Sequence, residues 1–150
     1  MLFKKIIPLL VLVLALSCQP GGPSTVEYLS SETTKSMSVP FSDAVRVGNI
    51  LFVSGQLGII PGKMELVPGG MAAEAKQAIE NMRAILEANG SSLNRVVKVT
   101  VFLADIEEWG EFNSVYTSYF SENLPARSAM GVNGLALGGR LEIECIAVVE

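Results

Sequence analysis

The chain has 150 residues, of which 49% are hydrophobic and 17% are charged, which fits one globular domain with a short appendage. Its formal net charge of −4 argues against a nucleic-acid partner, because phosphate binding needs clustered lysine and arginine that the sequence lacks. The absence of histidine excludes histidine-based triads and metal sites, so acid–base chemistry falls to carboxylates, tyrosine or lysine.

Residues 1–17 have the order of a secretory signal peptide, because Lys4 and Lys5 precede a mostly apolar run from Ile6 to Leu16. That run is shorter than the roughly 20 residues that a transmembrane helix needs. We therefore expect an export signal and no membrane-spanning anchor.

Cys18 follows Ala15-Leu16-Ser17, which resembles the lipobox of bacterial lipoproteins, where the cysteine is lipidated and becomes the new N-terminus. The alternative is an ordinary cleaved signal peptide with an incidental cysteine. Lipidation predicts an exported protein held on a membrane of the bacterial cell envelope. We interpret residues 18–36 as the lipidated cysteine and a flexible tether, and residues 37–150 as the folded domain.

The first predicted element of the domain is a β-hairpin. Residues 44–47 and 50–53 are apolar runs separated by Gly48-Asn49, which is a two-residue turn signal. Ser54-Gly55 ends the second strand and offers hydrogen-bond donors to an anion, although a structural turn explains these two residues equally well.

Two amphipathic helices are predicted. Between Gly70 and Gly90, apolar residues recur at spacings of three and four, with Glu74 and other charged residues on the remaining faces. Aromatic residues repeat with helical period from residue 109 to residue 120, a pattern that is more often core than ligand site. Asn113 lies within this second helix and is a surface residue by default.

Strands are predicted at residues 96–103, 128–132 and 141–149. The order of hairpin, helix, strand, helix, strand, strand predicts an α+β fold in which two helices cover one face of a mixed sheet. No further helix is predicted for the other face, so oligomerisation is the economical way to cover it. Cys145 in the last strand has neither a plausible disulfide partner nor metal-ligand spacing.

Three charged residues are candidates for chemistry. Arg127 opens an apolar strand, where it could grip a substrate carboxylate through two parallel hydrogen bonds, although a surface or interface ion pair is the simpler interpretation. Glu142 and Glu144 alternate with apolar residues, which puts both carboxylates on one strand face. Either that face is solvated, or one carboxylate orients or deprotonates a water.

Seven segments, in order, resemble the RidA/YjgF family of reactive enamine/imine deaminases, also called endoribonuclease L-PSP-like proteins, over nearly the whole stretch from Pro40 to Val149. The segments are residues 40–45, 53–58, 65–70, 100–103, 112–116, 125–128 and 141–148. The resemblance implies a chorismate-mutase-like α+β fold that assembles as a homotrimer with three clefts between neighbouring subunits.

The resemblance also implies a site and a reaction. In the family, the arginine of Pro-Ala-Arg-Ser binds the substrate carboxylate and the first glutamate of Glu-Ile-Glu positions the attacking water, which correspond to Arg127 and Glu142. Ser54, Gly55 and Asn113 would line the same cleft. The implied reaction is hydrolysis of 2-aminoacrylate and related acids to 2-keto acids and ammonia. An imine carbon is already electrophilic, so no cofactor or metal is expected.

Two departures from the family pattern fall in the implied substrate-binding site. Phe41 stands where active members usually carry tyrosine, and Ala129 stands where active deaminases often have cysteine. Three functions therefore stay open: an enamine/imine deaminase, a non-catalytic surface lipoprotein that binds small carboxylates on the same trimeric fold, and a surface scaffold.

Overall fold

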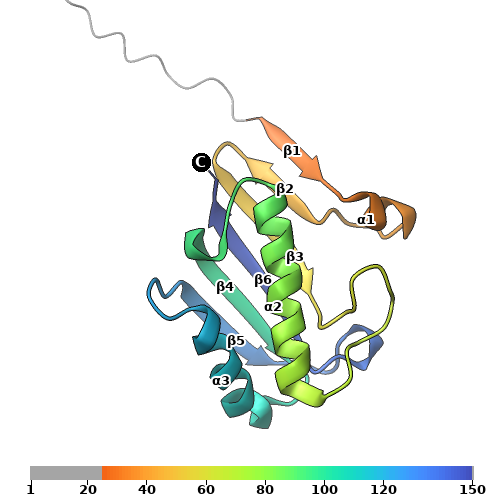
Figure 1. The fold of residues 1–150 in the computed structure, drawn as a ribbon, viewed down its shortest axis with the longest axis vertical. Coiled ribbons are helices and arrows are strands. Elements are labelled where there is room, and N and C mark those ends of the chain that lie inside the picture. The colour runs from red at the N-terminus through yellow and green to blue at the C-terminus, as the bar shows by residue number, and fades with distance from the viewer. Residues whose placement is uncertain (1–24, 150) are drawn as a thin grey trace, which may run out of the picture.

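A mixed sheet of six strands forms the centre of residues 25–149, the part of the chain that this computed structural model describes. The strand order is β1-β2-β3-β6-β4-β5, and all neighbours are antiparallel except β4 and β5, which are parallel. The strands are β1 (Val26–Leu29), β2 (Ala44–Val47), β3 (Ile50–Gln56), β4 (Val96–Leu103), β5 (Ala126–Gly131) and β6 (Leu141–Val148). Helices α2 (Gly70–Ala88) and α3 (Trp109–Tyr119) pack on one face, as the sequence predicts (Figure 1).

The central hairpin forms as its sequence predicts. β2 pairs with β3, with Ala44 opposite Val53 and Val47 opposite Ile50. Gly48 in the turn has a φ of 60°, in the left-handed region that glycine enters without steric cost. β3 also pairs with β6, which brings the end of β3 beside the start of β6.

The hydrophobic core lies between the sheet and its two helices. Every second residue of β6 from Leu141 to Ala147 is buried, and the apolar stripe of α2 covers this side of the sheet. The buried apolar residues of α2 are Met71, Ala75, Ala78, Ile79, Met82 and Leu86. Full burial of a leucine- or phenylalanine-sized side chain stabilises a fold by roughly 1.5–3 kcal/mol, so this packing fixes the position of β6.

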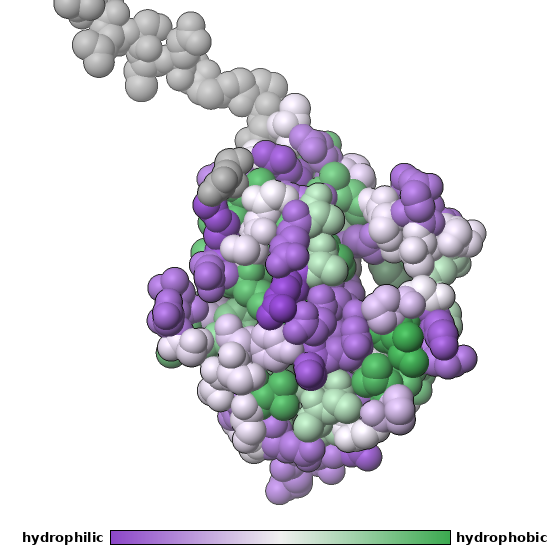
Figure 2. All heavy atoms as spheres, in the orientation of Figure 1, coloured by the Kyte–Doolittle hydropathy of each residue, from purple (hydrophilic) through white to green (hydrophobic). Residues whose placement is uncertain are grey.

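The two sides of the molecule differ in polarity. Hydrophilic side chains run along the outward side of α2 (Figure 2). On the sheet face opposite the helices, Phe52 is 44% and Met130 is 43% exposed, so large apolar side chains meet solvent there. That face fits the prediction of an oligomer, which stays a prediction. Within residues 25–149, no helix is both long and apolar enough to cross a membrane.

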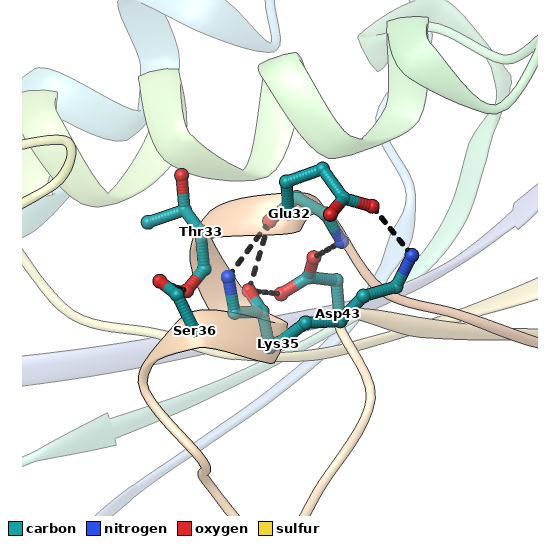
Figure 3. A network of polar contacts seen from close by, with 7 residues as sticks. Glu32, Thr33, Lys35, Ser36 and Asp43 are labelled. Carbon is teal, nitrogen blue, oxygen red and sulfur yellow. Dashed lines mark hydrogen bonds and ion pairs between the residues drawn. The ribbon is translucent and has the colours of Figure 1, made fainter.

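Ordered structure begins before residue 37, where the sequence analysis places the start of the domain. β1 pairs with β2, and helix α1 (Glu32–Ser36) follows it. The Asp43 carboxylate is turned towards α1 (Figure 3), accepting from the backbone N–H of Ser31 at 2.7 Å and from the hydroxyl of Thr34 at 2.5 Å.

The predicted tether therefore contains a strand, at residues 26–29, and a short helix, at residues 32–36. The sequence did not indicate them because both are short and depend on partners further along the chain. The predicted signal peptide at residues 1–17 and the predicted lipidation at Cys18 lie outside the described residues.

Candidate active site

Arg127 is a partly buried cation that lies against aromatic rings. It pairs across the sheet with buried Val99, which directs its side chain towards the helix-covered face. Its Cζ atom lies 4.4 Å from the ring centroid of Tyr116, 4.9 Å from that of Trp109 and 5.9 Å from that of Phe112. Its guanidinium has no hydrogen bond or ion pair with any residue between 25 and 149. The N–H donors are therefore free to meet an anion.

The three rings come from one face of α3. Residues 109, 112 and 116 are three and four positions apart, so their side chains stand next to one another along the helix. Phe112 is fully buried and Tyr116 is 4% exposed, which confirms the prediction that these aromatics belong to the core. This row also lies under Arg127, which the sequence pattern does not predict. The sequence signal that could have indicated this contact is the three- and four-residue spacing of the aromatics together with an arginine in the next strand.

Glu142 lies on the opposite face of the sheet. It alternates with buried Leu141 and Ile143, and it pairs with Phe102 of β4, which pairs with Met130 of β5. Partial burial raises the pKa of the Glu142 carboxyl, and the like charge of Glu144 adds to this effect. The alternation agrees with the prediction that both glutamates share one face.

Gly55 makes room for the Glu142 carboxylate. A Cβ atom built at Gly55 would lie 1.8 Å from Glu142 Oε1, closer than any two such atoms can approach. The family resemblance implies that Gly55 lines the cleft. The structure adds the physical reason that glycine is required, which is the close approach of the carboxylate to the main chain.

Ser54 is tied to the loop that carries Phe41. Its hydroxyl donates to the carbonyl of Ser42 at 2.7 Å, and its backbone N–H donates to the carbonyl of Asp43 at 3.0 Å. Both donors of Ser54 are therefore engaged within the subunit, which leaves the oxygen lone pairs to meet a ligand. The role of Ser54 in substrate binding stays a prediction.

Phe41 and Gly55 line a common groove. This groove of about 680 Å³ lies between α1, α2 and the loop of residues 57–64, and Figure 2 shows the surface hollowed there. Phe41 is 57% exposed, and the apolar residues Leu57, Met64 and Leu137 also line the groove. Most of the exposed surface of the groove wall is apolar, although polar residues line it as well.

Asn113 and Ala129 lie on the same side of the sheet as Arg127. Asn113 belongs to α3, and its buried Oδ1 atom has no hydrogen-bond partner among residues 25–149. The Tyr116 hydroxyl is likewise buried and unpartnered within that range. Ala129 follows Arg127 by two positions in β5 and pairs with buried Val101, so it shares the face of Arg127.

The candidate residues thus form two groups on opposite faces. Arg127, Ala129 and α3 belong to the helix-covered face, whereas Glu142 and Gly55 belong to the other face. One subunit does not bring Arg127 and Glu142 together.

Glu74 is only 6% exposed, whereas the helical periodicity of the sequence predicts that it lies on a polar helix face. Its Oε2 atom accepts a hydrogen bond from the backbone N–H of Arg140 at 2.9 Å. A buried carboxylate needs such a donor, and the amphipathic pattern alone does not reveal it. Because Arg140 directly precedes β6, this bond helps to position the strand that carries Glu142.

Comparisons with known proteins agree with this fold. A family model described as Endoribonuclease L-PSP matches residues 33–149. The mouse protein named 2-iminobutanoate/2-iminopropanoate deaminase is 48% identical over 118 residues, which are 77% of this chain and 87% of that protein. The chain belongs to this RidA/YjgF family.

Solved structures give the same picture. The E. coli YjgF structure superposes with a TM-score of 0.74 at 33% identity, covering 83% of this chain and 100% of that chain. RidA from a Psychrobacter species has a TM-score of 0.71 at 42% identity, covering 81% and 94%. The predicted α+β fold of the YjgF type is therefore confirmed, whereas the predicted homotrimer stays a prediction.

Proposed function

We propose that this chain is a hydrolytic deaminase of reactive enamine and imine acids, which it converts to 2-keto acids and ammonia. The observation that carries the proposal is the Arg127 guanidinium, which is partly buried and has no anionic partner within residues 25–149. Such a group binds a carboxylate through two charge-assisted hydrogen bonds. The mammalian relatives are named 2-iminobutanoate/2-iminopropanoate deaminase, which supports an imino acid as the substrate that carries this carboxylate.

The site forms between neighbouring subunits of a homotrimer in this proposal. Arg127 of one subunit holds the substrate carboxylate, and Glu142 of the next subunit faces the imine carbon. The positions of these two residues on opposite faces of the sheet support this arrangement, because neither face alone carries both groups.

Glu142 acts on the water. Its raised pKa makes it a stronger base than an ordinary glutamate, so it accepts a proton as the water oxygen bonds to the imine carbon. The substrate binds as the iminium, already protonated on nitrogen, so loss of the water proton to Glu142 gives the neutral carbinolamine. Glu142 returns this proton to the nitrogen, and the C–N bond breaks so that ammonia leaves. The hydroxyl proton passes to the ionised Glu142 as the carbonyl of the keto acid forms, and Glu142 then releases it to solvent. An enamine substrate first tautomerises to the imine.

The test is release of ammonia and keto acid from 2-aminoacrylate generated enzymatically in the assay. We expect Arg127→Ala to lower kcat/KM by at least about a hundredfold, because one charge-assisted bidentate contact and its orientation of the substrate are lost. Thermal unfolding and size measurements establish that the variant is folded. A folded Arg127→Ala protein with full activity would contradict the proposal.

A second candidate is a non-catalytic protein that binds small carboxylates. Arg127 supports it as well, since it has no carboxylate partner within residues 25–149. Phe41 and Ala129 also support it, because they lack the hydroxyl and the thiol common in active members. Saturable, Arg127-dependent binding of 2-oxobutanoate without any release of ammonia would favour this function over the deaminase.

A further part of the proposal concerns the N-terminus and rests on the sequence alone. We propose that residues 1–17 direct export and that Cys18 is lipidated and anchors the protein to a membrane of the bacterial cell envelope. Metabolic labelling with a radioactive fatty acid tests this. Label in the wild-type protein and none in Cys18→Ser is the expected result, and equal labelling of both would contradict it.

A further inference from the structure

A partly buried arginine ordinarily forms an ion pair with a carboxylate, whereas Arg127 packs against the faces of aromatic rings. We propose that Trp109 and Tyr116 are positioning residues, whose ring faces hold the Arg127 guanidinium in place of a counter-ion and leave its N–H donors for the substrate carboxylate. This inference rests on the proposed deaminase function and adds to it the means by which the carboxylate receptor is held.

The contact geometry supports a cation–π interaction at both rings. The Arg127 Cζ atom is 4.4 Å from the Tyr116 centroid and 4.9 Å from the Trp109 centroid, within the range of roughly 6 Å over which such contacts are attractive. Phe112 lies farther away, at 5.9 Å, and contributes less. A ring face attracts the positive charge without an acceptor oxygen, so the guanidinium keeps its donors for a bidentate carboxylate.

Two other arginines show the usual arrangement. Arg83 also lies over a ring of α3, that of Tyr119 at 5.2 Å, but it forms an ion pair with Glu80 at 2.9 Å. Arg140 forms an ion pair with Glu108. The aromatic contact alone therefore does not distinguish Arg127 from Arg83. What distinguishes it is the ring contact together with the absence of a carboxylate partner within residues 25–149.

This arrangement favours substrate binding for an energetic reason. An arginine already paired with a carboxylate of its own subunit would exchange one ion pair for another when substrate arrives, so the net gain would be small. A guanidinium held by ring faces keeps those contacts and gains the charge-assisted hydrogen bonds in addition.

Two substitutions of Tyr116 distinguish the contribution of its ring face from that of its hydroxyl. The hydroxyl is buried and makes no hydrogen bond within the described range, so the ring face is what the proposal assigns to this residue. Phenylalanine keeps that face and should replace Tyr116 without loss. Leucine keeps apolar volume but has no π system, and it should not replace Tyr116.

The experiment compares Trp109→Leu, Tyr116→Leu, Trp109→Phe and Tyr116→Phe in the full-length chain. The probes are 2-aminoacrylate generated in the assay, for turnover, and 2-oxobutanoate, for direct binding by calorimetry. We expect each leucine variant to raise KM and the 2-oxobutanoate Kd roughly three- to tenfold with kcat near the wild-type value, since a cation–π contact acts on ground state and transition state alike. Both phenylalanine variants should stay within about twofold of wild type.

Tyr119→Leu is the matched control. It removes a ring of the same helix that lies under Arg83 and also removes a hydroxyl bonded to Glu80. We expect this variant to lower Tm while KM and Kd stay unchanged. Trp109 is less buried than Tyr116, so Trp109→Leu keeps the test valid if Tyr116→Leu fails to fold.

The outcomes separate this inference from the function on which it rests. Wild-type KM and Kd in folded leucine variants would overturn the inference and leave the deaminase proposal standing. Phenylalanine variants as impaired as the leucine variants would also overturn it, because shape or the hydroxyl would then matter instead of the ring face. A wild-type chain that neither turns over nor binds either probe would overturn both proposals.

Discussion

The carboxylate of Glu142 lies directly over the main chain of Gly55, so close that a Cβ atom at residue 55 would approach Oε1 to 1.8 Å. We expect Gly55→Ala to push the Glu142 carboxylate out of its position and to lower kcat at least about tenfold, because a small displacement of a catalytic group has a large effect on rate. Overpacking should also lower the free energy of unfolding by about 1–3 kcal/mol.

Gly110→Ala is the control for this substitution. Nothing lies within 4 Å of a Cβ at Gly110, which is in α3, so alanine should leave activity unchanged and stabilise the helix by about 0.5–1 kcal/mol. Initial rates and denaturant unfolding of both variants check the pair. Full activity in a folded Gly55→Ala protein would show that the close contact is not required.

The raised pKa of Glu142 predicts the acid side of the pH–rate profile. The base must be ionised, and burial with the charge of Glu144 raises its pKa, so kcat/KM should fall with decreasing pH at values above the usual glutamate pKa. Glu144→Gln removes one cause of the shift and should move this limb to lower pH. Glu142→Gln should abolish turnover at every pH, and an unchanged profile in Glu144→Gln would contradict the assignment.

The same pKa shift predicts how stability depends on pH. Below both the unfolded and the folded pKa, Glu142 is protonated in both states and costs nothing. As pH rises through the unfolded and then the folded pKa, the unfolded state releases its proton first, so the folded state loses stability. Glu142→Gln should therefore raise Tm at neutral pH and have no effect on Tm at low pH. Thermal scans across the pH range, with Glu144→Gln alongside, test this.

Phe41 offers a gain-of-function prediction. The resemblance places a tyrosine hydroxyl at this position in active members, and Phe41 is exposed, so Phe41→Tyr should fold normally. One added hydrogen bond to substrate or water should raise kcat/KM roughly two- to tenfold, in line with a net value of about 0.5–1.5 kcal/mol. Parallel measurement of Phe41→Leu separates the hydroxyl from the ring. Equal activity in all three proteins would mean that residue 41 does not reach the substrate.

Most of the fold can be predicted from the periodic spacing of apolar residues in the sequence. The hairpin across Gly48-Asn49, the apolar stripe of α2, the β-branched run of β4 and the alternation in β6 all have the period of the element that they form. These segments are long or sharply bounded, and each buries one side against the same core. Local pattern and tertiary packing therefore agree.

The parts that the sequence did not reveal depend on distant partners. β1 and α1 need β2 and the Asp43 carboxylate, and burial of Glu74 depends on a backbone N–H sixty-six residues away, at Arg140. The faces taken by Arg127 and Glu142 follow from the register between β5, β4 and β6, which a single sequence does not specify. The residue types of the candidate site could be named from the sequence, but not their distribution over two faces.

Because Arg127 and Glu142 lie on opposite faces of the sheet, each active site of the proposed trimer needs residues from two neighbouring subunits. Arg127→Ala and Glu142→Gln damage different walls of each cleft, so the two inactive proteins, when coexpressed, should complement each other. Every mixed trimer would hold one cleft that joins an intact Arg127 to an intact Glu142. We expect partial recovery of activity when the two variants are coexpressed, and no recovery when the two preformed oligomers are mixed. This is the behaviour of an active site that two subunits build together.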